Sequence, residues 1–168
     1  QPEQTLAVTG AAGTLGNYVV ELAEHQGLTV VADAADQDLE LVESLGADHV
    51  VARGDDVAER IREFFPEGVD ALVDAAVLNE RAAPAVRDGG RFATVRNWDG
   101  DPGRGITVHR ISAPREHRSG HKLELLRRWV EEGVLTLRVA DVLPAAEAAA
   151  AHRRLEAGGV RGRLVLRF

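Results

Sequence analysis

The sequence of 168 residues contains no cysteine and no methionine, and lysine occurs once, at Lys122. Without cysteine, the chain has no disulfide framework, no thiolate ligand for zinc and no cysteine nucleophile. The formal net charge of -7 disfavours non-specific binding to nucleic acid or to an acidic membrane surface. No apolar run approaches the length of a membrane span, and we expect a cytoplasmic protein. The absence of methionine at position 1 indicates a processed chain or a piece of a longer one.

Apolar runs alternate with segments of helical periodicity, and 45% hydrophobic and 28% charged residues are typical of a folded protein. The predicted strands cover residues 5–9, 28–32, 49–51, 69–73, 91–95 and 106–111. The predicted helices cover residues 14–26, 36–46, 55–65, 79–86 and 121–132, and an extended segment, a helix and a strand follow at 135–142, 144–157 and 161–168. Strands separated by helices of this length indicate βαβ units and therefore an α/β fold with a parallel sheet.

A glycine-rich turn joins the first predicted strand to the first predicted helix. Gly10, Gly13 and Gly16 are spaced three residues apart, and Ala11 stands where the strict G-x-G-x-x-G pattern has a glycine. In a dinucleotide site, Gly13 lets the backbone approach the pyrophosphate, Gly16 lets the helix pack on the strand, and the helix N-terminus offers free N–H groups. The alternative is a tight turn that needs glycine and binds nothing.

Short-chain dehydrogenases also use a turn of this kind, together with a Tyr-x-x-x-Lys pair that hands a proton to the substrate. The only tyrosine here is Tyr18, within the first predicted helix, and the only lysine is Lys122. The pair cannot form, and this class is excluded.

Five segments resemble the medium-chain dehydrogenase/reductase superfamily, in particular its zinc-free, quinone-oxidoreductase-like branch. They are residues 8–13 (VTGAAG), 45–48 (LGAD), 69–74 (VDALVD), 89–91 (GGR) and 151–166. The resemblance implies a Rossmann doubly wound parallel sheet of order 3-2-1-4-5-6 in residues 1–143. It further implies that the helix and strand of residues 144–168 pack on a GroES-like domain that is missing from this chain.

The function implied by the resemblance is hydride transfer from NADPH or NADH to a small-molecule quinone, enone or related carbonyl. No catalytic residue and no metal ligand carries over to these residues, and neither nucleic acid nor a membrane is an expected partner. In the family, the edge strand corresponding to residues 106–111 forms a homodimer. A non-catalytic NAD(P)-binding sensor or interaction module is the alternative.

The end of the second strand decides between NAD and NADP in this fold. Counting from Gly16 puts Ala34 at the deciding position, whereas counting back from residues 45–48 puts Asp33 there. The nearby acids Asp33, Asp36 and Asp38 would repel a 2′-phosphate. Arg53 follows the third strand and could neutralise that phosphate. The family tips the expectation slightly towards NADP.

The nicotinamide half of the cofactor is expected at the carboxyl ends of the fourth and fifth strands. Relatives usually have glycines where this chain has Leu78, Asn79 and Glu80. The residues assigned to the cofactor are Gly10, Ala12, Gly13, Thr14, Leu15, Gly16, Asp33, Ala34, Arg53, Ala75, Ala76, Val77, Thr94 and Val95.

Overall fold

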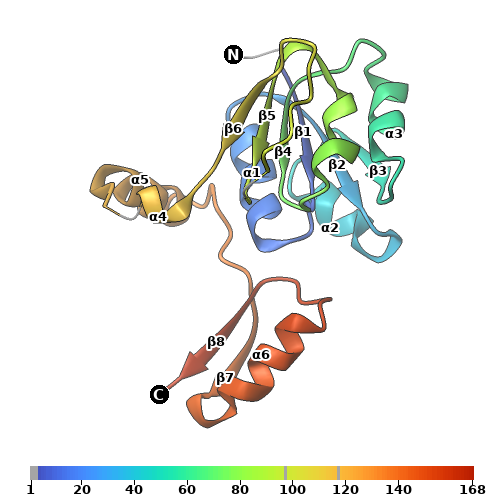
Figure 1. The fold of residues 1–168 in the computed structure, drawn as a ribbon. Coiled ribbons are helices and arrows are strands. Elements are labelled where there is room, and N and C mark those ends of the chain that lie inside the picture. Colours follow the sequence, from blue (N-terminus) through green and yellow to red (C-terminus); the bar gives the residue numbers. More distant parts are fainter. Residues whose placement is uncertain (1–3, 97, 117) are drawn as a thin grey trace. The chain divides into compact units, whose positions relative to one another are not determined.

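The computed structural model describes residues 4–96, 98–116 and 118–168. The chain divides into two compact units, Gln1–Leu135 and Thr136–Phe168. The sequence analysis predicts the boundary after the Rossmann domain eight residues later, between residues 143 and 144. Figure 1 labels the helices and strands of both units.

The first unit contains a six-stranded, fully parallel sheet of order β3-β2-β1-β4-β5-β6. This order confirms the predicted Rossmann topology, in which the chain reverses direction across the sheet between β1 and β4. The strands are β1 (Thr5–Thr9), β2 (Thr29–Ala34), β3 (His49–Ala52), β4 (Val69–Asp74), β5 (Val86–Thr94) and β6 (Thr107–Arg110).

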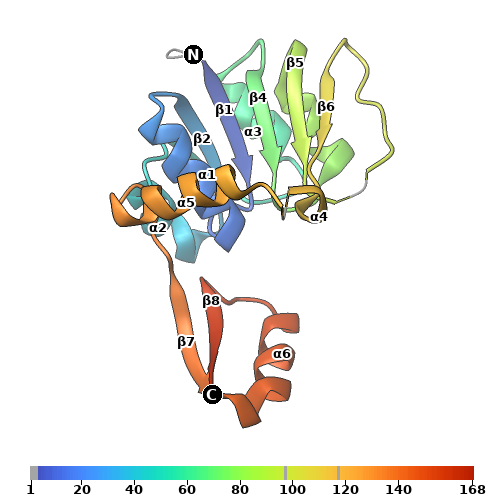
Figure 2. The ribbon, with the colours of Figure 1, turned by 90° about the vertical axis from the view of Figure 1, so that its left-hand side faces the viewer.

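Helices lie on both faces of this sheet, with α1 on one face and α3 on the other (Figures 1 and 2). Each face has its own hydrophobic core, because both sides of a parallel strand are covered. No helix of the described residues is long and apolar enough to span a membrane. The helices are α1 (Thr14–His25), α2 (Leu39–Ser44), α3 (Val57–Phe64), α4 (Ala113–Glu116) and α5 (Gly120–Glu131), with 3-10 turns η1 (Asp36–Asp38), η2 (Asn79–Arg81) and η3 (Ala83–Ala85).

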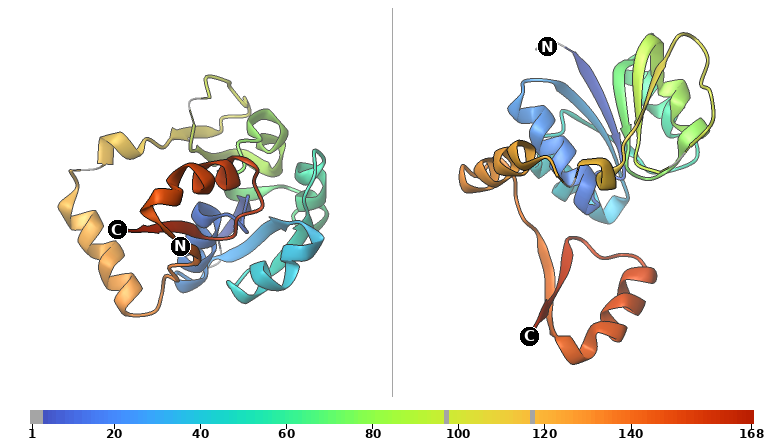
Figure 3. Two further views of the ribbon diagram at one scale, coloured as in Figure 1. Left: turned by 90° about the horizontal axis from the view of Figure 1, so that it is seen from below. Right: turned by 60° about the vertical axis from the view of Figure 1, so that its left-hand side comes forward.

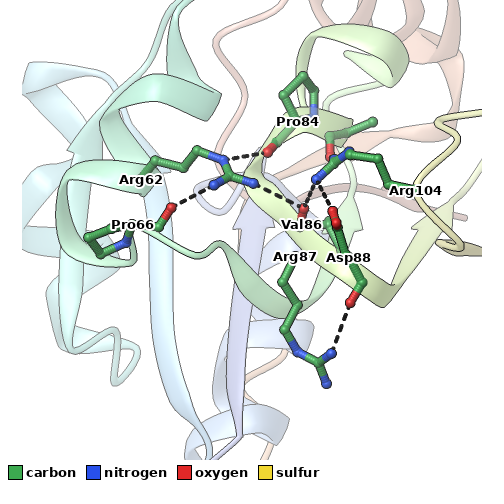
Figure 4. Close-up of polar contacts among 8 residues, drawn as sticks. Arg62, Pro66, Pro84, Val86, Arg87, Asp88 and Arg104 are labelled. Carbon is green, nitrogen blue, oxygen red and sulfur yellow. Dashed lines mark hydrogen bonds and ion pairs between the residues drawn. The ribbon is translucent and has the colours of Figure 1, made fainter.

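The start of β5 is held by two arginine side chains that donate to backbone carbonyl groups (Figure 4). Arg62 on α3 donates to the carbonyl oxygens of Pro84 at 2.7 Å, Pro66 at 2.6 Å and Val86 at 3.3 Å. Arg104 donates to the same Val86 oxygen at 2.7 Å. The planar guanidinium suits such multiple acceptors, so these contacts fix where β5 enters the sheet.

The second unit is a small βαβ element (Figure 3). Strand β7 (Val139–Pro144) pairs in parallel with β8 (Arg163–Arg167), and α6 (Ala148–Glu156) connects them through the 3-10 turn η4 (Ala145–Glu147). The unit begins before residue 144 because the whole of β7 pairs with β8.

Candidate functional site

The carboxyl ends of the parallel strands meet at one edge of the sheet, where Figure 2 shows the arrowheads of β1 and β4 pointing the same way. In open α/β sheets, ligands bind in the crevice outside this edge, where the strand order reverses. The structure brings the sequence-predicted residues to this edge: 10 and 12–16 follow β1, 33 and 34 end β2, Arg53 follows β3, 75–77 follow β4, 94 ends β5 and 95 follows it.

The glycine-rich turn has a geometry that needs glycine at two of its three positions. Gly10 has a φ of 70°, and a Cβ atom there would lie 3.0 Å from the backbone nitrogen of Ala76. A Cβ atom on Gly16 would lie only 2.2 Å from the carbonyl oxygen of Gly10. These two glycines therefore allow the turn to come close to the loop after β4 and allow α1 to pack against the turn.

Gly13 is the N-cap of α1 and closes the turn. Its N–H donates to the Gly10 carbonyl oxygen at 2.9 Å, and its own carbonyl oxygen accepts the N–H of Asn17 at 2.9 Å. The first N–H groups of a helix have no intrahelical acceptor and carry a partial positive charge. The first turn of α1 contains no acidic residue. Next to the buried Ala12, the half-buried Thr14 and the exposed Leu15, this helix start is suited to an anion.

Asp33 lies beneath the turn and is 2% exposed. Its Oδ1 accepts the N–H of Gly10 at 2.6 Å and the N–H of Ala11 at 3.3 Å. Burial raises the pKa of the Asp33 carboxyl, and the two N–H groups and the charge of Arg53 only partly offset this rise. The Asp33 carboxyl therefore binds the backbone of the glycine-rich turn.

A cavity of about 470 Å³ lies beside the ends of β2 and β3. It is lined by Ala34, Ala35, Asp36, Gln37, Ala52 and Arg53. Of the two positions that the sequence left open at the end of β2, Ala34 thus borders the cavity and Asp33 does not. The exposed Arg53 side chain brings the only positive charge among these lining residues.

A second buried carboxylate, Asp74, organises the loop after β4. It is fully buried and accepts hydrogen bonds from the Thr9 hydroxyl at 2.7 Å and from the backbone N–H groups of Leu78 at 3.0 Å and Asn79 at 2.7 Å. Sequence reasoning did not single out Asp74 for the site. The sequence does contain an indication of this role. An aspartate at the end of an apolar strand is expected to be buried, and a buried carboxylate needs hydrogen-bond donors nearby.

The loop that follows β4 is held in an unusual backbone conformation. Val77 and Asn79 have φ values of 60° and 53°, and a positive φ is a genuine outlier for a β-branched residue. Ala75, Ala76 and Val77 are half-buried. Thr94, at the end of β5, is buried and donates its hydroxyl to the Arg96 carbonyl oxygen at 3.1 Å, while Val95 beside it is half-buried. Of the three positions where relatives usually have glycine, only Asn79 has a positive φ, which asparagine tolerates, and the strained residue is Val77 just before them.

Comparison with known proteins now identifies the family. A family model described as zinc-binding dehydrogenase matches residues 45–166. The chain belongs to this family. The predicted resemblance to the medium-chain dehydrogenase/reductase superfamily and its quinone-oxidoreductase-like branch is confirmed.

Two relatives and one solved structure show how much of such proteins the chain represents. It is 28% identical to the chloroplastic NADPH-dependent alkenal/one oxidoreductase of Arabidopsis thaliana, over 77% of this chain and 31% of that protein. It is 27% identical to the NAD-dependent alcohol dehydrogenase of Sulfolobus acidocaldarius, over 99% of this chain and 51% of that protein. A mycobacterial structure complexed with NADPH matches with a TM-score of 0.86 and 25% identity, over 99% of this chain and 57% of that chain. The chain thus spans about half or less of the length of these proteins.

The family name refers to zinc, and the part of the chain that the structure describes offers no cluster of ligands for a zinc ion. The sequence has no cysteine. Within residues 4–96, 98–116 and 118–168, no three His, Asp or Glu side chains come together in a way that could hold a metal.

Proposed function

We propose that this chain is the NADP(H)-binding part of an oxidoreductase that reduces quinones, enones or related carbonyls by hydride transfer. The observation that carries the proposal is the Gly10–Gly16 turn, which opens α1 at the point where the strand order reverses. Two relatives, an NADPH-dependent alkenal/one oxidoreductase and a 2-haloacrylate reductase, support this substrate class.

The edge residues divide into three groups according to the part of the cofactor that they would hold. The N–H groups of Thr14 and Leu15 at the start of α1 would hold the diphosphate, and Gly13 would let the backbone approach it. The cavity beside Ala34 and Arg53 would take the adenosine ribose. Residues 75–77, with Thr94 and Val95, would lie against the nicotinamide half. The bound cofactor supplies the hydride, and the protein orients it and the substrate.

The choice of NADP over NAD rests on Arg53. Ala34 offers no carboxylate for a ribose 2′-hydroxyl group, whereas the guanidinium of Arg53 at the same cavity suits a 2′-phosphate. Asp36 lines the cavity as well and opposes this preference. We expect Arg53→Gln to weaken NADPH binding by about tenfold, the size of one charge-assisted hydrogen bond, and to leave NADH binding unchanged. Equal losses for both cofactors would contradict the NADP preference.

The alternative is a dinucleotide-binding sensor or interaction module without catalysis. Both readings require binding, which the fluorescence of added NADPH or NADH measures directly. If neither binds below millimolar concentration, the assignment of the glycine-rich turn is wrong. If one of them binds, and an enone or quinone oxidises it in a protein that also carries a substrate domain, the sensor alternative is excluded.

Residues 144–168 are proposed to pack on a GroES-like substrate domain. Apolar side chains within these residues are exposed in the structure, including Leu155 at 58% and Val165 at 38%. Such a surface is typical of an interface. Hydrogen exchange of β8 should slow when the substrate domain is fused to or mixed with this chain, and unchanged exchange would contradict the proposal.

A homodimer through β6 and a cytoplasmic location complete the proposal. Strand β6 is at the edge of the sheet, and unpaired edges favour pairing across a two-fold axis. His109 is exposed on this strand. We expect His109→Glu to lower the sedimentation coefficient to that of a monomer. Microscopy of a tagged protein tests the location.

A further inference from the structure

A second cavity, of about 270 Å³, lies between the 3-10 turns that precede β5 and the segment that connects β5 to β6. Its walls include Glu80 and Pro84 from the turns, and Trp98, Asp101 and Pro102 from the connecting segment. The core to which Trp98 belongs is the one that α3 covers, whereas the glycine-rich turn packs into the core on the other face of the sheet. None of the residues assigned to the cofactor lines this cavity, so it is a separate site.

Trp98 is a fixed wall of the cavity. It is only 9% exposed, and its ring packs edge-on against Phe92 with the ring centroids 5.2 Å apart. A Cβ atom on Gly100 would overlap the indole, so glycine at this position makes room for the ring. Arg110 donates from Nε to the Trp98 carbonyl oxygen at 2.8 Å. The indole N–H of Trp98 makes no hydrogen bond to the residues that the structure describes and is free to donate to a ligand.

The charged side chains around the cavity leave an excess of negative charge. Arg104 is already engaged, because it donates to two backbone carbonyl oxygens beside the start of β5 and pairs with Asp88 at 3.2 Å (Figure 4). Glu80 is exposed and has no charged partner in the described part of the chain. Asp101 is exposed as well and accepts a single backbone N–H, at 2.8 Å. Two carboxylates at the cavity are therefore available to a cation.

We propose that this cavity binds a small methylated ammonium ion, which the indole of Trp98 and the carboxylates of Glu80 and Asp101 attract together. A cation is drawn to the face of an aromatic ring, most strongly to that of tryptophan, and quaternary ammonium groups are typical ligands of such sites. The rings of Pro84 and Pro102 offer apolar surface to the methyl groups. Both carboxylates are exposed and act through their charge, which favours a methylated ammonium over a primary one. The site does not depend on dinucleotide binding.

Choline and its neutral isostere 3,3-dimethylbutan-1-ol test the proposal, because the two molecules differ in charge and hardly in shape. In an NMR titration of the 168-residue chain, we expect the indole N–H signal of Trp98 to shift with choline, with a dissociation constant in the millimolar range. The neutral alcohol should bind at least several-fold more weakly. The signal of Trp129, the other tryptophan, should stay in place, and its loss in Trp129→Phe assigns the two signals.

Three substitutions at the site separate its charge from its aromatic wall. Glu80→Gln and Asp101→Asn each remove one negative charge at almost unchanged shape, and we expect each to weaken choline binding about threefold. Trp98→Phe should weaken it about fivefold, because phenylalanine attracts a cation less strongly than tryptophan. If Trp98→Phe does not fold, the two charge variants still decide. Glu40→Gln is the matched control, since it removes an exposed acid from α2, outside the cavity, and should bind choline as the wild type does.

Three results would overturn the inference. A Trp98 signal that does not move with millimolar choline would show that the cavity takes no such cation. Equal binding of the neutral alcohol would show an apolar cavity without selectivity for charge. Equal weakening by Glu40→Gln and by the two charge variants at the site would show attraction by the net charge of the chain alone. None of these results bears on NADPH binding, which is measured separately.

Discussion

Replacing Gly16 by alanine tests the link between the turn and the fold. The added Cβ would lie 2.2 Å from the Gly10 carbonyl oxygen and 2.7 Å from the Ala11 Cα, whereas ordinary contact begins at 3.4 Å. The turn and α1 must therefore separate by about 1 Å, because the opposing atoms are backbone, and such overpacking costs about 3 kcal/mol. Alanine returns about 1 kcal/mol through its helix propensity. Weakening of the two hydrogen bonds to Asp33 adds about 1 kcal/mol.

The expected net loss is about 3 kcal/mol in the free energy of unfolding, which for a domain of this size lowers Tm by about 10 °C. Urea unfolding followed by circular dichroism measures it, and NADPH binding by the folded fraction should weaken as well. Gly120→Ala is the matched control, because Gly120 begins α5 with no heavy atom within 4 Å of an added Cβ. It should stay within about 0.5 kcal/mol of the wild type. A Gly16→Ala protein as stable as this control would refute the reasoning.

Three further substitutions test other parts of the first unit. Val77→Gly should raise the free energy of unfolding in urea by about 1 kcal/mol, because glycine adopts the positive φ of Val77 without strain. A lower free energy of unfolding would contradict this. Burial raises the pKa of Asp70, but hydrogen bonds from Thr5 and Arg87 outweigh it and the pKa lies below its ordinary value. The stabilisation that the ionised Asp70 provides is therefore present at neutral pH and is lost as the pH falls through the folded-state pKa. Asp70→Asn should lower Tm at pH 7, and the difference from the wild type should shrink in acid. A difference in Tm that does not change with pH would contradict the lowered pKa of Asp70. Arg62→Lys should lose about 1–2 kcal/mol, since an ammonium group cannot serve three carbonyl oxygens in the plane of a guanidinium, and thermal unfolding unchanged from wild type would show that the contacts contribute little.

The positions of the strands and the glycine-rich turn could be predicted because their signals are local, whereas the order of the strands followed from the family resemblance. Each strand is a short apolar run that ends at a turn residue, and the turn is a fixed spacing of glycines between a strand and a helix. The position of Asp33 under the turn could not be predicted in this way. Its partners are backbone N–H groups 22 and 23 residues away, and backbone donors leave no mark in the sequence.

The helix predicted for residues 79–86 shows where local signals fail. The structure has two 3-10 turns there, η2 and η3. Pro84 has no N–H to donate, and the positive φ of Asn79 does not fit a right-handed helix. Strand β5 begins earlier than the predicted residue 91, at Val86, because the arginine contacts to Val86 and a register shift in its pairing with β4 carry it across polar residues that interrupt the apolar pattern.

The turn between β1 and α1 presents main-chain N–H groups rather than side chains to its proposed ligand. Main-chain groups are common to every amino acid, so substitutions can accumulate around the turn as long as positions 10 and 16 remain glycine, where a Cβ atom would meet the backbone. This permits wide divergence at constant architecture, in line with 25% identity at a TM-score of 0.86 to the mycobacterial structure. Evolution of a new substrate preference can then proceed elsewhere in such a protein without rebuilding this edge of the sheet.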